Sequence, residues 1–524
     1  MYQQGNVNGS PKHGHYGAYD DHHDDHYATP GRHSQTHGYV GRDSQHEPLG
    51  VVAYDERTFA ASGLKREEVE VGVPLYEGSN HTAAQRFIRT GYRDVWALVL
   101  FALVVMLSCG LAARNARDLH NGTLHISHNA RNDLHAMREW LPLGFGLALL
   151  VAGFVFAAMR AFTEQFIIIA NVLVIVINAA FAAWAFARGY VVMGVIWGLI
   201  AALNAVWLYF VRRRIPFAAV LLRTSVTLIT RHYGTLVTSF ACLLAGAVYL
   251  AVWVFMGAPV FTQISDAHDN GTSVPGWVAP AVLGMLIALL WASQVCANVA
   301  HVTTSGVVAT WYFFGEAAMP PGPSAASAKR ALTTSFGSIC FGSAVVALLK
   351  TIYYFLRRAI DAIDQPIVEC ILGCILGVIE RLTELFNIYA FTQVAIYGHD
   401  FVTAAKQTFA LVKESGWSLI INDCLVWRSL AITNLVCSLG LCVVFWIAFN
   451  PIVGLLTLAV ALSVFTIFFR PVYAGIATQF VCIAENPTAM EVANPEWAAT
   501  TNALKPQDVG NQETGGDQRP VQRV

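Results

Sequence analysis

Charged residues are scarce in this sequence. Asp, Glu, Lys and Arg make up only 13% of the 524 residues, whereas 55% are hydrophobic. An average soluble domain carries roughly 25% charged residues, so a chain this long with so little charge cannot cover a water-facing surface. The formal net charge is −1, which gives no general attraction to nucleic acid or to an anionic surface. These shortages exclude an ordinary soluble protein, and we expect no nucleic-acid partner.

The sequence also lacks the patterns of metal sites, disulfide frameworks and common enzymes. Most of the ten cysteines lie in apolar runs, where Cys behaves as a small hydrophobe, and they show no paired metal-ligand spacing. No HExxH, GxSxG or P-loop motif occurs, and no GxGD motif lies within an apolar run. We therefore expect no metal, no cofactor and no enzymatic activity.

What the sequence does contain is apolar runs of about 20 residues, the length that a helix needs to cross a hydrocarbon core of ~30 Å. The predicted fold class is an all-α, polytopic transmembrane helical bundle with about ten spans. These spans are predicted at residues 95–113, 141–159, 166–187, 190–211, 234–257, 278–300, 335–356, 368–397, 430–449 and 451–469.

Two further apolar segments do not fit this pattern. Residues 215–231 carry Arg223 and Arg231 among apolar residues, which predicts an interfacial helix. Residues 301–314 are too short to span a bilayer, so they either extend the sixth span or re-enter the membrane.

The two ends of the chain differ from its apolar centre. Residues 1–85 are rich in His, Tyr, Gly, Asp and Gln without apolar periodicity, which predicts a disordered cytosolic tail. Its histidines show no repeating ligand spacing. Residues 86–487 form the predicted transmembrane domain, and residues 488–524 form a polar C-terminal tail. The first apolar run begins only near Asp94, so we expect no signal peptide.

The distribution of Lys and Arg predicts the orientation. With the N-terminus in the cytosol, the inner segments hold about twice as many Lys and Arg residues as the outer loops. An even number of spans then places both termini in the cytosol. Sequons at Asn121 and Asn270 fall in predicted outer loops and are candidate glycosylation sites. Equivalent sequons at Asn8 and Asn80 lie inside in the same arrangement, so sequons alone do not fix it.

A polar side chain in hydrocarbon is costly unless it is paired or hydrated, so each one is a candidate site. The sixth span carries a polar stripe with steps of 3 and 4 residues, which places all members on one helix face. This stripe consists of Trp291, Gln294, Asn298, His301 and Ser305. Such a face either makes hydrogen bonds between helices or lines a substrate pathway, and both interpretations stay open.

A second polar stripe in the eighth span is formed by Glu380, Glu384 and Asn387, again at helical spacing. A cationic substrate or a proton would find a partner there. Alternatively, both glutamates lie near the membrane interface and are solvated. We expect Arg381 to point elsewhere, and Lys350 of the seventh span to extend toward the interface instead of neutralising a glutamate.

Small residues in the seventh and eighth spans predict close helix contacts. Gly337 and Gly342 belong to a small-residue patch in the seventh span, and Gly373 and Gly377 form a GxxxG pattern in the eighth. Glycine lets helix backbones approach each other in membranes.

Several segments resemble, in the same order, the signature segments of the choline transporter-like family. These are residues 93–96 (RDVW), 306–312 (GVVATWY), 335–343 (SFGSICFGS) and 394–405 (VAIYGHDFVTAA). The resemblance covers about residues 86–490 and implies ten spans, cytosolic termini and transport of choline or a related amine. The loop at 114–140 lacks cysteine and Thr478 stands where the family implies Asp. The short loop without cysteine makes the chain most similar to the fungal and plant-type branch.

We therefore expect a transporter of choline or a related small organic cation that works by alternating access through the bundle. Its surroundings would be the lipid bilayer of the plasma membrane or of an internal membrane. A non-transporting scaffold or regulatory protein is the alternative, and a membrane-embedded enzyme is a third. Deletion of residues 1–85 separates the first two, because a transporter keeps its flux without the tail.

Overall fold

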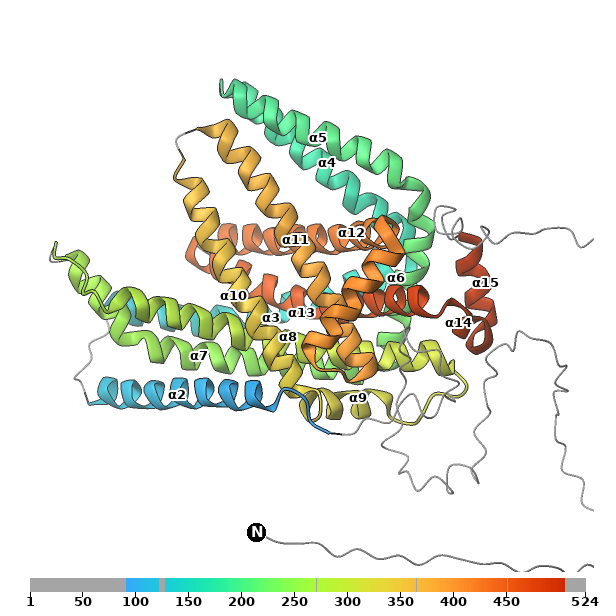
Figure 1. Ribbon diagram of the computed structural model, residues 1–524. Helices are drawn as coiled ribbons and strands as arrows, with labels where there is room; N and C mark the ends of the chain where they lie inside the picture. Colours follow the sequence, from blue (N-terminus) through green and yellow to red (C-terminus); the bar gives the residue numbers. More distant parts are fainter. Residues whose placement is uncertain (1–90, 122–127, 270, 364, 450, 505–524) are drawn as a thin grey trace, which may run out of the picture. The chain divides into compact units, whose positions relative to one another are not determined.

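The structure is a computed structural model that describes residues 91–121, 128–269, 271–363, 365–449 and 451–504. In this part of the chain all regular elements are helices, and no strand occurs. In chain order (Figure 1) they are α2 (Val95–His120), α3 (His128–Ala161), α4 (Thr163–Ala187), α5 (Val191–Val211), the short 3₁₀ helix η2 (Arg212–Arg214), α6 (Ile215–Arg231), α7 (Gly234–Asp269), α8 (Val278–Phe314), α9 (Pro323–Leu332), α10 (Phe336–Asp361), α11 (Pro366–Tyr397), α12 (Phe401–Ala448), α13 (Pro451–Glu485), α14 (Pro487–Ala493) and α15 (Pro495–Leu504).

Nine helical segments of the described chain are long and apolar enough to cross a membrane. The predicted all-α, polytopic bundle is therefore confirmed. Helix α11, which holds the predicted eighth span, is not among the nine. Its charges at Glu369, Glu380, Arg381 and Glu384 leave no long stretch that is poor in charge. That α11 spans the membrane stays a prediction.

The two ambiguous segments have clear places in the structure. Helix α8 is continuous from Val278 to Phe314, so residues 301–314 extend the sixth span and do not re-enter. Helix α6 is amphipathic, with Leu222 and Val226 fully buried and Arg223 exposed. Its apolar face packs against α13, α4 and α3. That face is thus covered by protein, whereas the sequence predicted a helix lying at the membrane interface.

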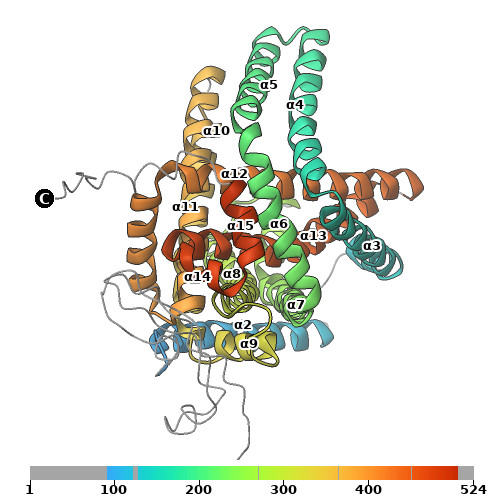
Figure 2. The ribbon, with the colours of Figure 1, turned by 90° about the vertical axis from the view of Figure 1, so that its right-hand side faces the viewer.

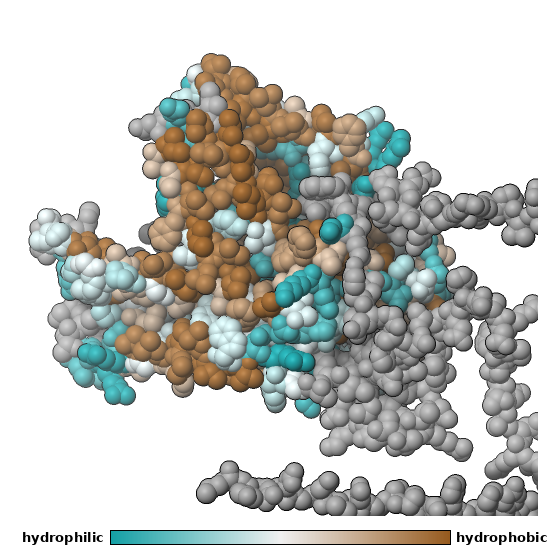
Figure 3. All heavy atoms as spheres, viewed as in Figure 1, coloured by the Kyte–Doolittle hydropathy of each residue, from teal (hydrophilic) through white to brown (hydrophobic). Residues whose placement is uncertain are grey.

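Exposed apolar side chains are frequent on the outer helices. On α5, Leu199, Leu203 and Phe210 are 59%, 68% and 72% exposed, and Figure 3 shows brown apolar surface over the region of α4 and α5. Helix α5 packs mainly against α4. Large apolar surfaces are not stable in water and mark contact with a membrane or a partner. These faces suit a lipid environment.

The N-termini of three helices meet at Asp94, just before α2. One carboxylate oxygen, Oδ2, accepts hydrogen bonds from Ser338 Oγ of α10 at 2.8 Å and from the Phe401 amide of α12 at 3.1 Å. Asp94 has a φ of +50°, a left-handed conformation that Asp tolerates better than most residues. Three segments of the family resemblance, 93–96, 335–343 and 394–405, therefore meet at one point.

The small residues behave differently in the two helices. A Cβ atom at Gly337 would meet the backbone of Arg93 and Asp94, and one at Gly342 would meet the ring of Phe401. The predicted close contacts are thus confirmed for α10. At Gly373 and at Gly377 of α11 an added Cβ would meet no described atom within 4 Å. The predicted close helix contact at these two glycines was wrong within the described residues, because open space lies beside both of them.

The last two helices fold back over the ends of α6 and α8, as Figure 2 shows. Trp497 of α15 donates a hydrogen bond from Nε1 to Thr224 Oγ1 at 2.8 Å, and its ring packs edge-on against Trp311. Residues 488–504, predicted as part of a polar tail, therefore include a helical pair that packs on the bundle.

Candidate functional site

Polar side chains continue along three helices that pack against one another. Helix α8 packs against α11 and α13, and α11 also packs against α13. We call the residues that these helices contribute the polar column. They are Asn298, His301 and Ser305 of α8, Glu384, Thr392, Gln393 and Tyr397 of α11, and Arg470 and Glu485 of α13. Polar groups inside a membrane bundle are expensive and mark functional sites more often than polar groups elsewhere.

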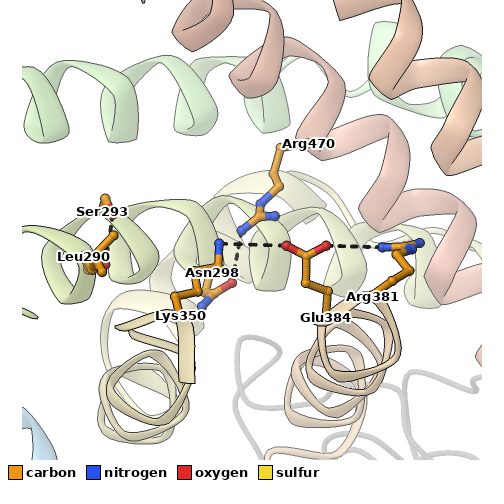
Figure 4. A network of polar contacts seen from close by, with 7 residues as sticks. All are labelled: Leu290, Ser293, Asn298, Lys350, Arg381, Glu384 and Arg470. Carbon is orange, nitrogen blue, oxygen red and sulfur yellow. Dashed lines mark hydrogen bonds and ion pairs between the residues drawn. The ribbon is translucent and has the colours of Figure 1, made fainter. Parts of the chain in front are cut away.

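At one end of the polar column, Glu384 is paired with two cations (Figure 4). Lys350 Nζ of α10 lies 3.9 Å from Oε1, and Arg381 Nη1 lies 3.5 Å from Oε2. The prediction that Arg381 points elsewhere was wrong, because its long side chain reaches the residue one turn later. The prediction for Lys350 was also wrong, since the ammonium turns toward Glu384. Formation of an ion pair offsets the cost of burying each charge.

Arg381 is held further by two aromatic side chains. Its Nη2 donates a hydrogen bond to the hydroxyl of Tyr473 at 2.9 Å, and its guanidinium lies 4.0 Å from the centre of the Trp427 ring. Arginine stacks well on aromatic faces. This contact fixes Arg381 beside Glu384.

The charges of this cluster do not sum to an acidic site. Glu380 lies one turn before Glu384 and interacts electrostatically with Lys350. Arg470 of α13 lies within electrostatic range of both Glu384 and Lys350. The cluster therefore holds three cationic groups, Lys350, Arg381 and Arg470, against two carboxylates. A free cation would meet net positive charge here.

The first half of the α8 stripe makes hydrogen bonds between helices. Trp291 Nε1 donates to the Cys340 carbonyl at 2.9 Å, and Asn298 Nδ2 donates to Ser343 Oγ at 2.9 Å. Arg470 Nη2 approaches Asn298 Oδ1 at 3.4 Å. These contacts favour the interpretation of interhelical bonding for Trp291 and Asn298.

The polar atoms in the second half of the stripe have fewer hydrogen-bond partners. His301 Nε2 and Thr392 Oγ1 are 3.1 Å apart. The Thr392 hydroxyl donates to the Ile388 carbonyl, so His301 is the donor and its Nδ1 is left as an acceptor. That Nδ1 and the Ser305 hydroxyl are buried and have no hydrogen-bond partner among the described residues. Buried polar atoms of this kind call for water or a ligand.

Two other predicted members lie beside the polar column. Gln294 is partly exposed, and Asn387 is 8% exposed. Asn387 lies one turn beyond Glu384 on α11, toward Thr392.

At the other end of the polar column lies a carboxylate that the sequence patterns did not single out. Glu485 accepts hydrogen bonds from Gln393 Nε2 and from the Tyr397 hydroxyl, both on α11. His399 stacks on the Tyr397 ring, with the ring centres 5.6 Å apart. The predicted last span ended at residue 469, whereas α13 continues through Pro471 to Glu485. Because we expected the helix to end early, Glu485 fell outside the membrane-spanning part.

The glycosylation candidates are only partly described. Asn121 is exposed in the turn that follows α2. Asn270, like residues 1–90 and 505–524, lies outside the described residues. Both sites stay predictions.

Apolar helices of membrane-spanning length around a buried polar column define a polytopic α-helical membrane protein with a candidate solute path. The sequence model of a family described as plasma-membrane choline transporter matches residues 195–488. The chain belongs to the choline transporter-like family, and this is a family of membrane transporters.

Relatives cover most of the chain. A CTL-like protein of Dictyostelium discoideum is 28% identical over 443 residues, which are 80% of this chain and 76% of the relative. The protein PNS1 of Eremothecium gossypii is 29% identical over 435 residues, or 77% of each chain. The pns1 protein of Aspergillus fumigatus is 27% identical over 453 residues, or 78% and 82% of the two chains.

Proposed function

We propose that this transporter carries choline or a related small organic cation along the polar column by alternating access. The observation that carries the proposal is the row of polar side chains on three mutually packed helices, α8, α11 and α13. His301 Nδ1 and Ser305 Oγ offer buried hydrogen-bonding atoms without partners among the described residues. A hydroxylated solute could bind to both.

The ion pairs of Glu384 supply the moving part of this mechanism. Lys350 belongs to α10 and Glu384 to α11, so their contact joins two helices that are linked at residues 362–365. Side-chain exposures of 31% and 34% mean that water can replace each partner. We propose that this pair breaks and reforms as α10 and α11 move, while the hydrogen-bonded contacts of Asn298 keep α8 attached to α10.

The choice of substrate rests on the family, whose description names choline. The same description supports the plasma membrane as the location, with an internal membrane as the alternative. The fungal relatives carry names that state no substrate. The substrate therefore has to be measured on this chain.

Uptake of tritiated choline into proteoliposomes tests the proposal. We expect saturable uptake above that of protein-free liposomes, reduced by excess unlabelled choline. A chain without residues 1–85 should show the same uptake, since the polar column lies in the helical part. Uptake equal to that of protein-free liposomes would refute choline as the substrate. A scaffold would be favoured if the full chain shows no uptake and its cellular function is lost when residues 1–85 alone are removed.

A further inference from the structure

We propose that Glu485, and not Glu384, supplies the negative charge that binds a cationic substrate in this protein. The site would be formed by Glu485 with Gln393 and Tyr397, where α13 ends. This inference rests on the proposed function and names the residue at which the positive charge of the substrate is held.

The partners of the two carboxylates differ in charge. Glu384 lies within 4 Å of two cationic side chains, at 3.9 Å from Lys350 and 3.5 Å from Arg381. Glu485 accepts hydrogen bonds only from neutral donors, the Gln393 amide and the Tyr397 hydroxyl, and has no cationic partner among the described residues. A partly buried carboxylate without a counter-charge gains most from an incoming cation.

A second observation points to a ligand at the same place. The side chain of Gln393 is 1% exposed, and its Oε1 has no hydrogen-bond partner among the described residues. Its Nε2 is already bonded to Glu485. The free carbonyl oxygen can accept a hydrogen bond from a hydroxyl or ammonium group bound beside Glu485.

The aromatic surroundings suit an organic cation better than a metal ion. The Tyr397 ring lies beside the carboxylate and is stacked on His399. Tyr312 of α8 donates a hydrogen bond at 2.9 Å to the carbonyl of Asn486, the residue that follows Glu485. Aromatic faces attract quaternary ammonium groups, which cannot donate hydrogen bonds. A carboxylate, aromatic rings and one buried acceptor together match a small alkylammonium alcohol.

The position of Glu485 also fits a substrate path along the polar column. Gln393 and Tyr397 are four residues apart on α11 and so share a helix face. Thr392, which bonds His301, directly precedes Gln393. Glu485 therefore lies at the end of the polar column that is opposite to the cation-rich cluster around Glu384.

Equilibrium binding to the purified full chain in detergent tests the inference. The labelled ligand is tritiated choline. Binding of its neutral carbon isostere, 3,3-dimethyl-1-butanol, is measured by competition with the labelled choline. We expect Glu485→Gln to weaken choline binding by about tenfold or more while isostere binding changes by less than about twofold. Glu485→Asp should lie in between. The matched control is Glu496→Gln on α15, which neutralises an exposed carboxylate outside the polar column and should bind choline as the wild type does.

A measurement on the wild type avoids dependence on how variants fold. Bound choline should protect Glu485 from coupling to glycine ethyl ester by a water-soluble carbodiimide, as read by mass spectrometry. Unchanged choline affinity in Glu485→Gln, equal loss of both ligands, or no protection of Glu485 would each overturn the inference while choline transport stands. A wild type that binds neither choline, ethanolamine nor tetramethylammonium would refute the proposed substrate class, and this site with it.

Discussion

Among single side chains, Glu384 is the one whose surroundings allow the clearest prediction. Glu384→Gln removes the charge that lies between Lys350 and Arg381. The two cations then lack a counter-charge in a site where each is less than a third exposed. We expect a loss of stability of about 1–3 kcal/mol. A lower midpoint of thermal unfolding in detergent would show it.

The control for this prediction is a second substitution on α10. Lys350→Met in the Glu384→Gln background removes one unpaired cation and keeps the length of the side chain. We expect the double variant to recover part of the lost midpoint, because loss of a whole ion pair costs less than loss of one partner. Equal midpoints of the single variant and the wild type would mean that water solvates Lys350 and Arg381 well enough without Glu384.

The sequence led to some of these side chains and not to others, for physical reasons. Helical spacing was enough to place Glu384 on one face of α11 and Asn298 on one face of α8, because that periodicity is local. The pairing of Lys350 with Glu384 joins two helices, and no local rule gives it. Glu485 was missed because the last predicted span ended at residue 469, whereas α13 continues through Pro471 to Glu485, although Pro often ends or kinks a helix.

Among the helices, the start of α10 depends on a glycine. A methyl group at Gly337 would meet the main chain of Arg93 and Asp94, which cannot turn away as a side chain could. We expect Gly337→Ala to cost about 1–3 kcal/mol through overpacking. Gly373→Ala on α11 is the matched control, because no described atom lies within 4 Å of the added Cβ. Comparable expression and unfolding midpoints for both variants would contradict the packing argument.

The junction at Asp94 yields a second prediction about helices. Asp94→Ala removes the acceptor of two hydrogen bonds, from Ser338 and from the Phe401 amide, and disfavours the positive φ. We expect a cost of about 2–3 kcal/mol. Asp94→Asn should retain most of the stability, since Asn keeps an oxygen acceptor and tolerates this backbone conformation.

Asp400 provides the comparison for Asp94. It accepts hydrogen bonds from the amide and the hydroxyl of Thr403 and thus caps α12 alone. Asp400→Ala should cost about 1 kcal/mol, the usual value for one helix cap. If the two alanine variants unfold at the same temperature, Asp94 acts as an ordinary cap and not as the link between three helices.

Across the full bundle, hydropathy predicted more than polar patterning did. Runs of about 20 apolar residues located the helices, because each transmembrane helix satisfies its own backbone hydrogen bonds. The exceptions are regions where protein covers the helix, as for α6 beneath α13, or where charges are paired, as on α11. Local sequence does not tell lipid-facing from protein-facing apolar surface.

The last prediction concerns how the bundle is oriented. The turns that join α4 to α5, α7 to α8 and α10 to α11 lie toward one end in Figure 1, and α9, α14 and α15 lie toward the other. The second end carries the Arg212–Arg214 run with Lys329 and Arg330 of α9. By the positive-inside rule, that end faces the cytosol. The predicted outer segments at 114–140 and 258–276, which include ends of α2, α3 and α7, are then outside, and the His-rich tail is inside.

Labelling with a membrane-impermeant maleimide on intact cells decides this orientation. We expect Thr272→Cys, in the loop after α7, to react, and Ser324→Cys, at the start of α9, to react only after the membrane is permeabilised. The unmodified chain corrects for its own free cysteines, most of which lie within the apolar helices. A mass shift on glycosidase treatment that disappears in Asn121→Gln or Asn270→Gln would support the same orientation independently. Reaction of Ser324→Cys alone in intact cells would invert the topology, because Lys and Arg would then be concentrated on the outer face, against the rule that fixed the prediction.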